Sequence, residues 1–419
     1  MRFGLIYHHQ LPRPWEEDSE ERLFNESLEQ IELADRLGFD YAWATEHHFL
    51  EEYSHSSAPE VFLAAAAART NNIRLAHGIV SLPAAVNHPV RVAERLATLD
   101  LISGGRVDFG SGAGSSQLEL GAFGVDRDTK KDQWEESLEV ITRLLTETPF
   151  TGHQGKWVDV PPRNLLPKSK QKPHPPLWMA CSARTTIETA ARNGIGALSF
   201  SFVSPAEAKE WVDTYYDIIA SDECVPAGRD VNPNFSVVFP FMCHPDEETA
   251  LDRGLDGAHF FSYSLMHYYI TGQHRPGVTD VWQDFQDNRA SVGLTREPAA
   301  PADGEEPTAE AKAMLEQITS LRRGIGTPEQ VAEVIRQYEQ AGVDQLIFSV
   351  QVGKNRHEHI LESLELFARE VMPEFVERRE ARETAKRERL AAPVKAALGR
   401  IRKNAADVSD YVISPELGA

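Results

Sequence analysis

Short apolar runs that alternate with helix-like segments constrain the fold of this 419-residue chain more than any other feature. Eight runs have the length and composition of buried strands: residues 1–7, 39–43, 73–80, 106–110, 177–180, 197–202, 235–243 and 344–350. Apolar residues at helical spacing follow each run, over 21–37, 59–69, 90–102, 132–146, 184–192, 205–220, 247–258 and 357–371, with a further helix over 328–341. Alternating strands and helices form a parallel sheet, and eight such units close it. The sequence therefore predicts an α/β fold of the (β/α)8 TIM barrel class. An open, doubly wound sheet is the main alternative, but the dinucleotide-binding glycine fingerprint is missing.

Two long segments and a tail are expected to lie outside the regular alternation. The barrel should span residues 1–375, with an excursion of little regular structure at 150–176. Residues 263–326 begin at the barrel mouth, and their acidic, Pro-rich part at 298–307 should stay loose. This insertion is expected to act as a lid; its candidate covering side chains are Tyr263, Tyr268, Tyr269, Trp282 and Phe285. Residues 376–419 are predicted to form a basic helical tail that packs on the barrel or on a partner subunit.

The composition argues against several classes of function. A formal net charge of −21 disfavours binding to nucleic acids or to anionic membranes. The sequence contains no apolar run of about 18 residues that would indicate a transmembrane helix, and its first residues are strand-like, unlike a signal peptide. Cys181, Cys224 and Cys243 are far apart, which predicts neither a disulfide framework nor a metal cluster. These features are typical of a reduced, cytoplasmic enzyme.

Two histidines and a carboxylate directly follow the second expected strand, in the segment Glu46-His47-His48. The carboxyl ends of the strands are where barrels carry their chemistry. Because neighbouring strand residues point to opposite faces, His47 is expected to face the mouth and His48 to support it from behind. A histidine can move a proton near neutral pH, and either Glu46 or His48 is expected to fix the His47 tautomer. A metal site that also uses His8 and His9, and a purely structural role, are the alternatives.

Two turns after later strands are candidate ligand sites. The turn Gly110-Ser111-Gly112-Ala113-Gly114 would let a planar or anionic ligand approach the backbone closely, although a plain loop is equally compatible. The turn Cys181-Ser182-Ala183-Arg184-Thr185 leads into a helix, where free amides and hydroxyl groups form an anion site. Ordinary N-capping by Ser182 is the alternative for that turn.

Taken together, these segments resemble the bacterial luciferase-like flavin monooxygenases from residue 1 to about residue 375. The resemblance is carried by Thr45-Glu46-His47-His48-Phe49, by residues 88–94 (HPVRVAE), by residues 104–112 (GGRVDFGSG) and by the turn at 181–185. Gly342-Val343-Asp344, before the last strand, also fits. The order of these matches along the chain is more specific than any one of them.

The resemblance implies a two-component monooxygenase that binds reduced FMN at the barrel mouth. A separate flavin reductase would supply the reduced FMN, which reacts with O2, and the resulting flavin hydroperoxide would oxygenate a small organic substrate. His47 matches the family histidine implicated in the chemistry, and Ser182 and Thr185 match the turn that holds the FMN phosphate. Ala113 stands where luciferase has a phosphate-binding arginine, so we expect Arg184 to take its place.

The resemblance also indicates where the flavin ring and a second subunit would lie. Gly78 and Ile79 occupy the place where some members carry a non-proline cis peptide under the isoalloxazine, and Gly110 and Gly112 would line the cofactor. A homodimer is expected on the second and third helices, where the alanine run at 64–68 offers a flat surface.

Three other functions stay open at this stage. A relative that uses the deazaflavin F420 for hydride transfer would share the barrel and the phosphate site. A non-catalytic flavin-binding barrel would bind flavin without turnover. A metal hydrolase is the last of these alternatives. None of the sequence motifs identifies the substrate.

Overall fold

Eight parallel strands form a closed barrel in the structure, a computed structural model that describes residues 1–199, 203–296, 320–401 and 407–414. The strands are β1 (Arg2–Tyr7), β2 (Tyr41–Ala44), β3 (Arg74–His77), β5 (Val107–Gly112), β8 (Leu177–Cys181), β9 (Gly196–Ser199), β10 (Phe235–Pro240) and β13 (Gln345–Gln351). Each pairs with its neighbour in chain order, and β13 pairs with β1. The (β/α)8 prediction is confirmed. The predicted sixth strand extends to residues 200–202, which lie outside the described residues.

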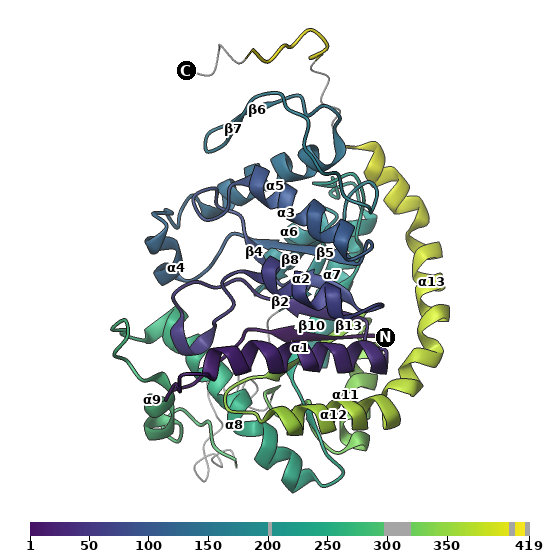
Figure 1. Cartoon of the computed structure of the whole chain (residues 1–419). Helices are drawn as coiled ribbons and strands as arrows, with labels where there is room; N and C mark the ends of the chain where they lie inside the picture. The colour runs from purple at the N-terminus through teal and green to yellow at the C-terminus, as the bar shows by residue number, and fades with distance from the viewer. Residues whose placement is uncertain (200–202, 297–319, 402–406, 415–419) are drawn as a thin grey trace, which may run out of the picture.

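Helices surround the strands and cover their outer faces (Figure 1). They are α1 (Ser19–Leu37), α2 (Pro59–Arg69), α3 (Pro89–Ile102), α5 (Lys130–Thr146), α6 (Arg184–Arg192), α7 (Pro205–Ala220), α8 (Glu247–Met266), α11 (Pro328–Gln340) and α12 (His357–Glu370). Helix α1 ends where Gly38 adopts the left-handed conformation, at φ 87°. The barrel interior is filled by its own apolar cluster, in which the rings of Trp43 and Trp178 meet edge to face at 5.3 Å. The barrel is therefore a packed core, and ligand space is left only toward its ends.

The third predicted strand is divided into two pieces. β3 ends at His77, and a second short strand, β4 (Val80–Ser81), continues after Gly78 and Ile79. A Cβ atom at Gly110 in β5 would lie 2.0 Å from the carbonyl oxygen of His77. Only glycine permits this approach between neighbouring strands. The break leaves the Gly78–Ile79 turn at the carboxyl end of β3.

The two insertions contain more regular structure than the sequence suggests. The excursion carries a small antiparallel pair, and the second insertion is helical over much of its described part. The first insertion contains the strands β6 (His153–Gln154) and β7 (Asp159–Val160). The second contains the end of α8, the π-helix η2 (His267–Thr271), α9 (Val281–Asn288) and β12 (Ile325–Gly326). Strand β12 pairs with β11 (Met242–Cys243). The loose stretch expected at 298–307 lies outside the described residues. Two further short elements, η1 (Glu51–Tyr53) and α4 (Gln117–Ala122), lie after β2 and β5.

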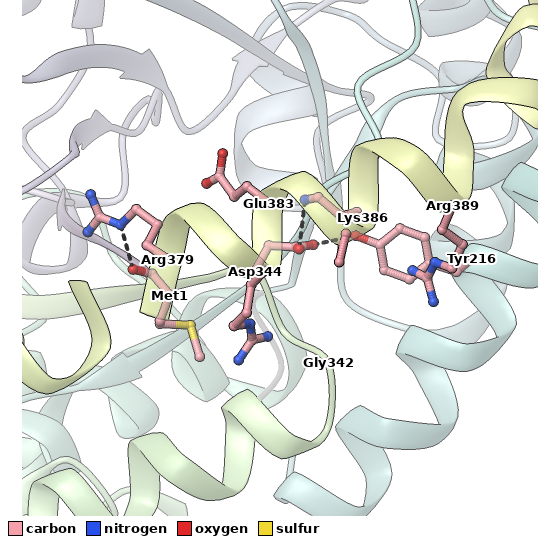
Figure 2. A pocket seen from close by; sticks show the side chains of 10 residues that line it. Met1, Tyr216, Gly342, Asp344, Arg379, Glu383, Lys386 and Arg389 are labelled. Atoms are coloured by element: carbon pink, nitrogen blue, oxygen red, sulfur yellow. Dashed lines mark hydrogen bonds and ion pairs between the residues drawn. The ribbon is translucent and has the colours of Figure 1, made fainter. Parts of the chain in front are cut away.

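Residues 376–399 of the basic tail belong to one long helix, α13 (Met372–Gly399), which runs along the side of the molecule where the N-terminus lies (Figure 1). Arg379 pairs with Asp40 at 2.7 Å, and Lys386 pairs with Asp344 at 2.7 Å. Figure 2 shows Lys386 and the Tyr216 hydroxyl converging on Asp344. A pocket of about 320 Å3 lies beside them, at the N-terminal ends of β1 and β13. The tail thus packs on its own barrel, at the end opposite the histidine segment.

No helix in the described part of the chain is long and apolar enough to cross a membrane.

Candidate functional site

A cavity of about 680 Å3 lies at the carboxyl ends of the strands, where the histidine segment leaves β2. Its size falls within the range of about 300–1,000 Å3 that is usual for ligand sites. Residues that follow five of the strands form its wall, and residues of α4, α5, α8 and η2 form its rim. Of the site residues expected from the sequence, the cavity is lined by Glu46, His47, His48, Gly78, Ile79, Gly112, Ser182 and Thr185, but not by Gly110, Cys181 and Arg184.

Glu46 is the centre of a buried hydrogen-bond network at one side of the cavity. Its side chain is only 6% exposed, and its carboxylate accepts the backbone N–H of Ser81 at 2.9 Å and the Asn87 amide at 2.7 Å. The Nε2 atom of His48 lies 3.0 Å from the same carboxylate. Burial lowers the pKa of His48, but the hydrogen bond and charge of Glu46 outweigh burial, so the net pKa is raised above its ordinary value. Glu46 therefore holds both His48 and the β4 backbone in place.

His47 makes a separate set of contacts. Its Nδ1 atom lies 3.2 Å from Oε1 of Glu119 and 3.4 Å from the Tyr269 hydroxyl. The same Glu119 oxygen accepts the backbone N–H of His48 at 2.8 Å. The expectation that Glu46 or His48 fixes the His47 tautomer is wrong, because Glu119 is the carboxylate in contact with the His47 ring.

The expected opposite facing of the two histidines is also wrong. Both His47 and His48 line the same cavity, with side chains 17% and 18% exposed. β2 ends at Ala44, so the two histidines lie beyond the strand, where the alternation of faces no longer applies. Their roles differ through their partners rather than through their facing.

Hydroxyl side chains gather at the start of α6. Ser182 and Thr185 line the cavity there, as do Thr186 and Thr189. The first amides of a helix lack intrahelical acceptors and carry a partial positive charge, which suits an anion. The corner therefore has the donors that a phosphate group needs.

The expected cation of that corner is a different residue. The Arg184 side chain is 58% exposed and lies 3.7 Å from Glu188, outside the cavity, so the proposal that it replaces the arginine missing at Ala113 is wrong. Lys130 lines the cavity instead, and its Nζ donates to the Gly114 carbonyl at 2.6 Å. Burial lowers the pKa of Lys130. Helix α5 thus brings an ammonium group to the wall that the sequence left without one.

Gly112 and Ile79 lie against each other in the wall of the cavity. A Cβ atom at Gly112 would lie 2.8 Å from Cδ1 of Ile79, so a side chain there would displace the isoleucine. The cis peptide bonds in the described residues all precede proline, so the Gly78–Ile79 bond is trans, contrary to the possibility raised by the family resemblance. Cys181 is fully buried, and burial raises the pKa of its thiol to about 12. It supports the turn from behind.

The two histidines that follow β1 do not complete a metal site. His8 stacks on His47 with ring centroids 6.2 Å apart, whereas His9 packs between the rings of Phe24 and Phe62. Across the part of the chain that the structure describes, no three His, Cys, Asp or Glu side chains are grouped as metal ligands would be.

A family model described as luciferase-like monooxygenase matches residues 1–345. The chain belongs to this family. Two uncharacterized proteins from Sinorhizobium fredii, y4vJ and y4wF, are 34% and 32% identical over 40% and 51% of this chain, and the chain covers only 47% and 60% of their lengths. Two relatives with named activities align with this chain over most of their length. The 4-hydroxyprotoasukamycin monooxygenase of Streptomyces nodosus subsp. asukaensis is 29% identical over 83% of this chain and 86% of its own length. The oxygenase component of the flavin-dependent trigonelline monooxygenase of Acinetobacter baylyi is 27% identical over 90% and 96%.

Solved structures share the fold of this luciferase-like protein. The monooxygenase RslO1 from Streptomyces bottropensis is 26% identical and superposes with a TM-score of 0.68, covering 90% of this chain and all (100%) of its own. A type II Baeyer–Villiger monooxygenase from Pseudomonas putida, solved in complex with FMN, gives a TM-score of 0.65 at 21% identity over 89% and 98% of the two chains. An F420-dependent secondary alcohol dehydrogenase gives 0.64 at 16% identity over 89% and 98%. The last two likenesses show the fold alone.

The rim of this luciferase-like site departs from expectation. Of the five aromatic residues expected to cover a ligand, Tyr269 lines the cavity, whereas Trp282 and Phe285 pack on Phe260 at 5.0 Å and 5.7 Å. Glu119 was missed because α4 has six residues, too few for a helical period to be recognised.

Proposed function

We propose that this protein is the oxygenase of a two-component system that uses reduced FMN and O2 to oxygenate a small organic substrate. One observation carries the proposal. A single cavity joins an anion-binding corner at the start of α6 to a histidine, His47, that is held by a carboxylate. A redox cofactor with a phosphate tail and a proton-transfer group would need this combination, and the relatives with long alignments are named monooxygenases.

The residues of the cavity fit FMN. Ser182, Thr185 and the first amides of α6 would hold its phosphate, with Lys130 as the nearby cation. The wall at Gly112 and Ile79 would accept the ring system, because Gly112 lets Ile79 pack directly against the β5 backbone, where a Cβ atom would lie 2.8 Å from its Cδ1. Reduced FMN bound there would supply the electrons that activate O2.

The chain's own residues would orient the reactants and move a proton. His47 is the residue that we assign to proton transfer, because its ring lines the cavity and its Nδ1 is occupied by Glu119. Its other nitrogen, Nε2, is then the one that exchanges a proton with the reacting groups. Glu46 and His48 support the site through the buried network around Ser81 rather than by exchanging protons themselves.

The rim indicates an apolar substrate. Tyr53, Phe261, Leu265, Tyr269 and Ile270 contribute to the wall around His47. Apolar side chains exclude water from a reduced and oxygen-reactive cofactor, which limits the loss of oxidising equivalents as hydrogen peroxide. A separate flavin reductase would deliver the cofactor, as the name of the trigonelline enzyme's oxygenase component implies for that protein.

Hydride transfer with F420 is the second candidate. The observation that favours it is the similarity of the fold to an F420-dependent alcohol dehydrogenase. The phosphate corner suits either cofactor, so the choice depends on oxygen chemistry.

Oxygen consumption decides between the two functions. The purified protein is supplied with reduced FMN, or with reduced F420, and with a panel of apolar carbonyl compounds and alkenes, while O2 uptake and products are followed by an oxygen electrode and mass spectrometry. We expect oxygenated product with FMN, and a loss of about 10²–10⁴-fold in His47→Ala. The control His153→Ala, whose ring pairs with Glu136 outside the cavity, should retain activity. Substrate turnover with F420 and without O2 would overturn the proposal.

A further inference from the structure

The short helix α4 lies between two glycines with left-handed backbone conformations. Gly114 has φ 73° and Gly124 has φ 68°, so both occupy a region that other residues rarely adopt. Segments that move as units commonly turn at a few such positions near their ends. Between them α4 carries Glu119 over the cavity, where the carboxylate reaches His47 from a position 72 residues along the chain. The contact therefore depends on where this segment lies.

The same segment meets the opposite side of the mouth. Ser116 Oγ donates to the carbonyl of Tyr268 in η2 at 3.4 Å, and Ser115 lines the cavity together with Tyr269. Leu120 is buried, with 1% exposed surface. Residues 115–123 therefore span the mouth of the cavity from β5 to η2. We call this segment the flap.

Two groups compete for the Nδ1 atom of His47. The Glu119 carboxylate at 3.2 Å can only accept, so its presence requires a proton on Nδ1. The Tyr269 hydroxyl at 3.4 Å can donate, because burial keeps its pKa well above the ordinary value. With Glu119 in place, the charged acceptor forms the stronger bond and Nδ1 carries the proton. Without Glu119, the tyrosine would donate to Nδ1 and the ring proton would move to Nε2.

We propose that the flap is a closure-linked switch: Glu119 is a positioning residue that places the ring proton of His47 on Nδ1 only when residues 115–123 cover the cavity. Closure then leaves the Nε2 lone pair available to take a proton at the moment that water is excluded. An open flap leaves Nε2 protonated and unable to act as a base. The switch rests on the proposed function for its purpose, but its geometry can be tested without any turnover.

Nitrogen NMR of the histidine-labelled protein reports the tautomer directly, and hydrogen exchange reports the flap. In the wild type we expect His47 protonated at Nδ1. In Glu119→Ala we expect the proton on Nε2 and faster amide exchange over residues 115–123. Glu119→Gln, which keeps a carbonyl acceptor, should restore the Nδ1 tautomer. Gln117→Ala, an exposed change on the same helix away from the cavity, is the matched control and should resemble the wild type.

Kinetics and binding complete the test. Loss of a group that orients a metal-binding histidine typically costs about 10–100-fold, and we expect a loss of similar size here: kcat for product formation should fall by that factor in Glu119→Ala, while the FMN dissociation constant should change little. His47 protonated at Nδ1 in Glu119→Ala, or exchange over residues 115–123 equal to that of the wild type, would overturn the switch. Absence of oxygenation by the wild type would overturn the proposed function instead, and the NMR and exchange results would still decide the switch.

Discussion

Replacement of Glu46 by alanine should destabilise the protein strongly, even though Glu46 lies in the most recognisable motif of the chain. The carboxylate accepts hydrogen bonds from the Ser81 amide, the Asn87 side chain and His48, at 2.9, 2.7 and 3.0 Å. Asn87 keeps a second acceptor, the Ser81 carbonyl at 3.0 Å, so two donors are left without their partner. The Ser81 amide is buried, and a buried donor that loses its acceptor costs about 1–3 kcal/mol, so the free energy of unfolding should fall by at least that amount; His48 lies partly exposed in the cavity wall and adds less.

Urea denaturation followed by circular dichroism, without flavin, measures this loss. Glu94→Ala is the control, because Glu94 pairs with Arg91 at an exposed position where ion pairs contribute about 0–1 kcal/mol. Glu46→Gln, which keeps one acceptor oxygen and the side-chain volume, should fall between the two. If Glu46→Ala is no less stable than Glu94→Ala, the network does not hold the β4 turn and the reasoning is refuted.

Three further outcomes follow from the site and the surface. The pKa of His48 is raised in the folded protein, so its protonated form stabilises the fold. This stabilisation is complete below the unfolded pKa of about 6.5 and is lost as the pH rises through the folded pKa. His48→Gln should therefore lower the free energy of unfolding more at acidic than at alkaline pH. In flavin titrations, Lys130→Met should weaken FMN binding by about 10-fold or more and leave riboflavin binding unchanged, because riboflavin has no phosphate. Arg184→Ala should change the affinity for neither flavin. Equal losses for both flavins in Lys130→Met would show that Lys130 does not contact the phosphate. Sedimentation at micromolar concentration should show a homodimer built on α2 and α3, where Val61 and Ile102 are 67% and 59% exposed. The double variant Val61→Lys, Ile102→Lys should sediment as a monomer. A monomeric wild type would contradict the predicted dimer.

The barrel could be predicted from the sequence because its strands are buried on both faces and appear as short continuous apolar runs, whereas its helices are buried on one face and show a helical period. The predicted third strand is too long, because the hydrophobic pattern of residues 73–80 contains no information about the close contact between Gly110 and the His77 carbonyl. Tertiary contacts of this kind are visible only once neighbouring strands are placed together.

The site was predictable where function coincides with a strand end. Glu46, His47 and His48 reach the cavity because they follow β2, and Ser182 reaches it because it follows β8. The partners of these residues were not predictable. Glu119 comes from a helix too short to show a period, and nothing in the sequence places it beside a ring 72 residues away.

The pairing of β1 with β13 sets the timing of folding during synthesis. Residues 2–7 hydrogen-bond to residues 345–351, so β1 is synthesised long before the strand with which it pairs. At about 5–20 residues per second this interval is roughly 20–70 s, during which one edge of β1 stays unpaired. Such long-range pairing is slow to form and leaves a strand edge open to association with other chains. Helix α13 is made after β13, and its Arg379 and Lys386 then bind Asp40 and Asp344 on the two sides of that junction. A helix that is synthesised after β13 thus stabilises the pairing of β13 with β1.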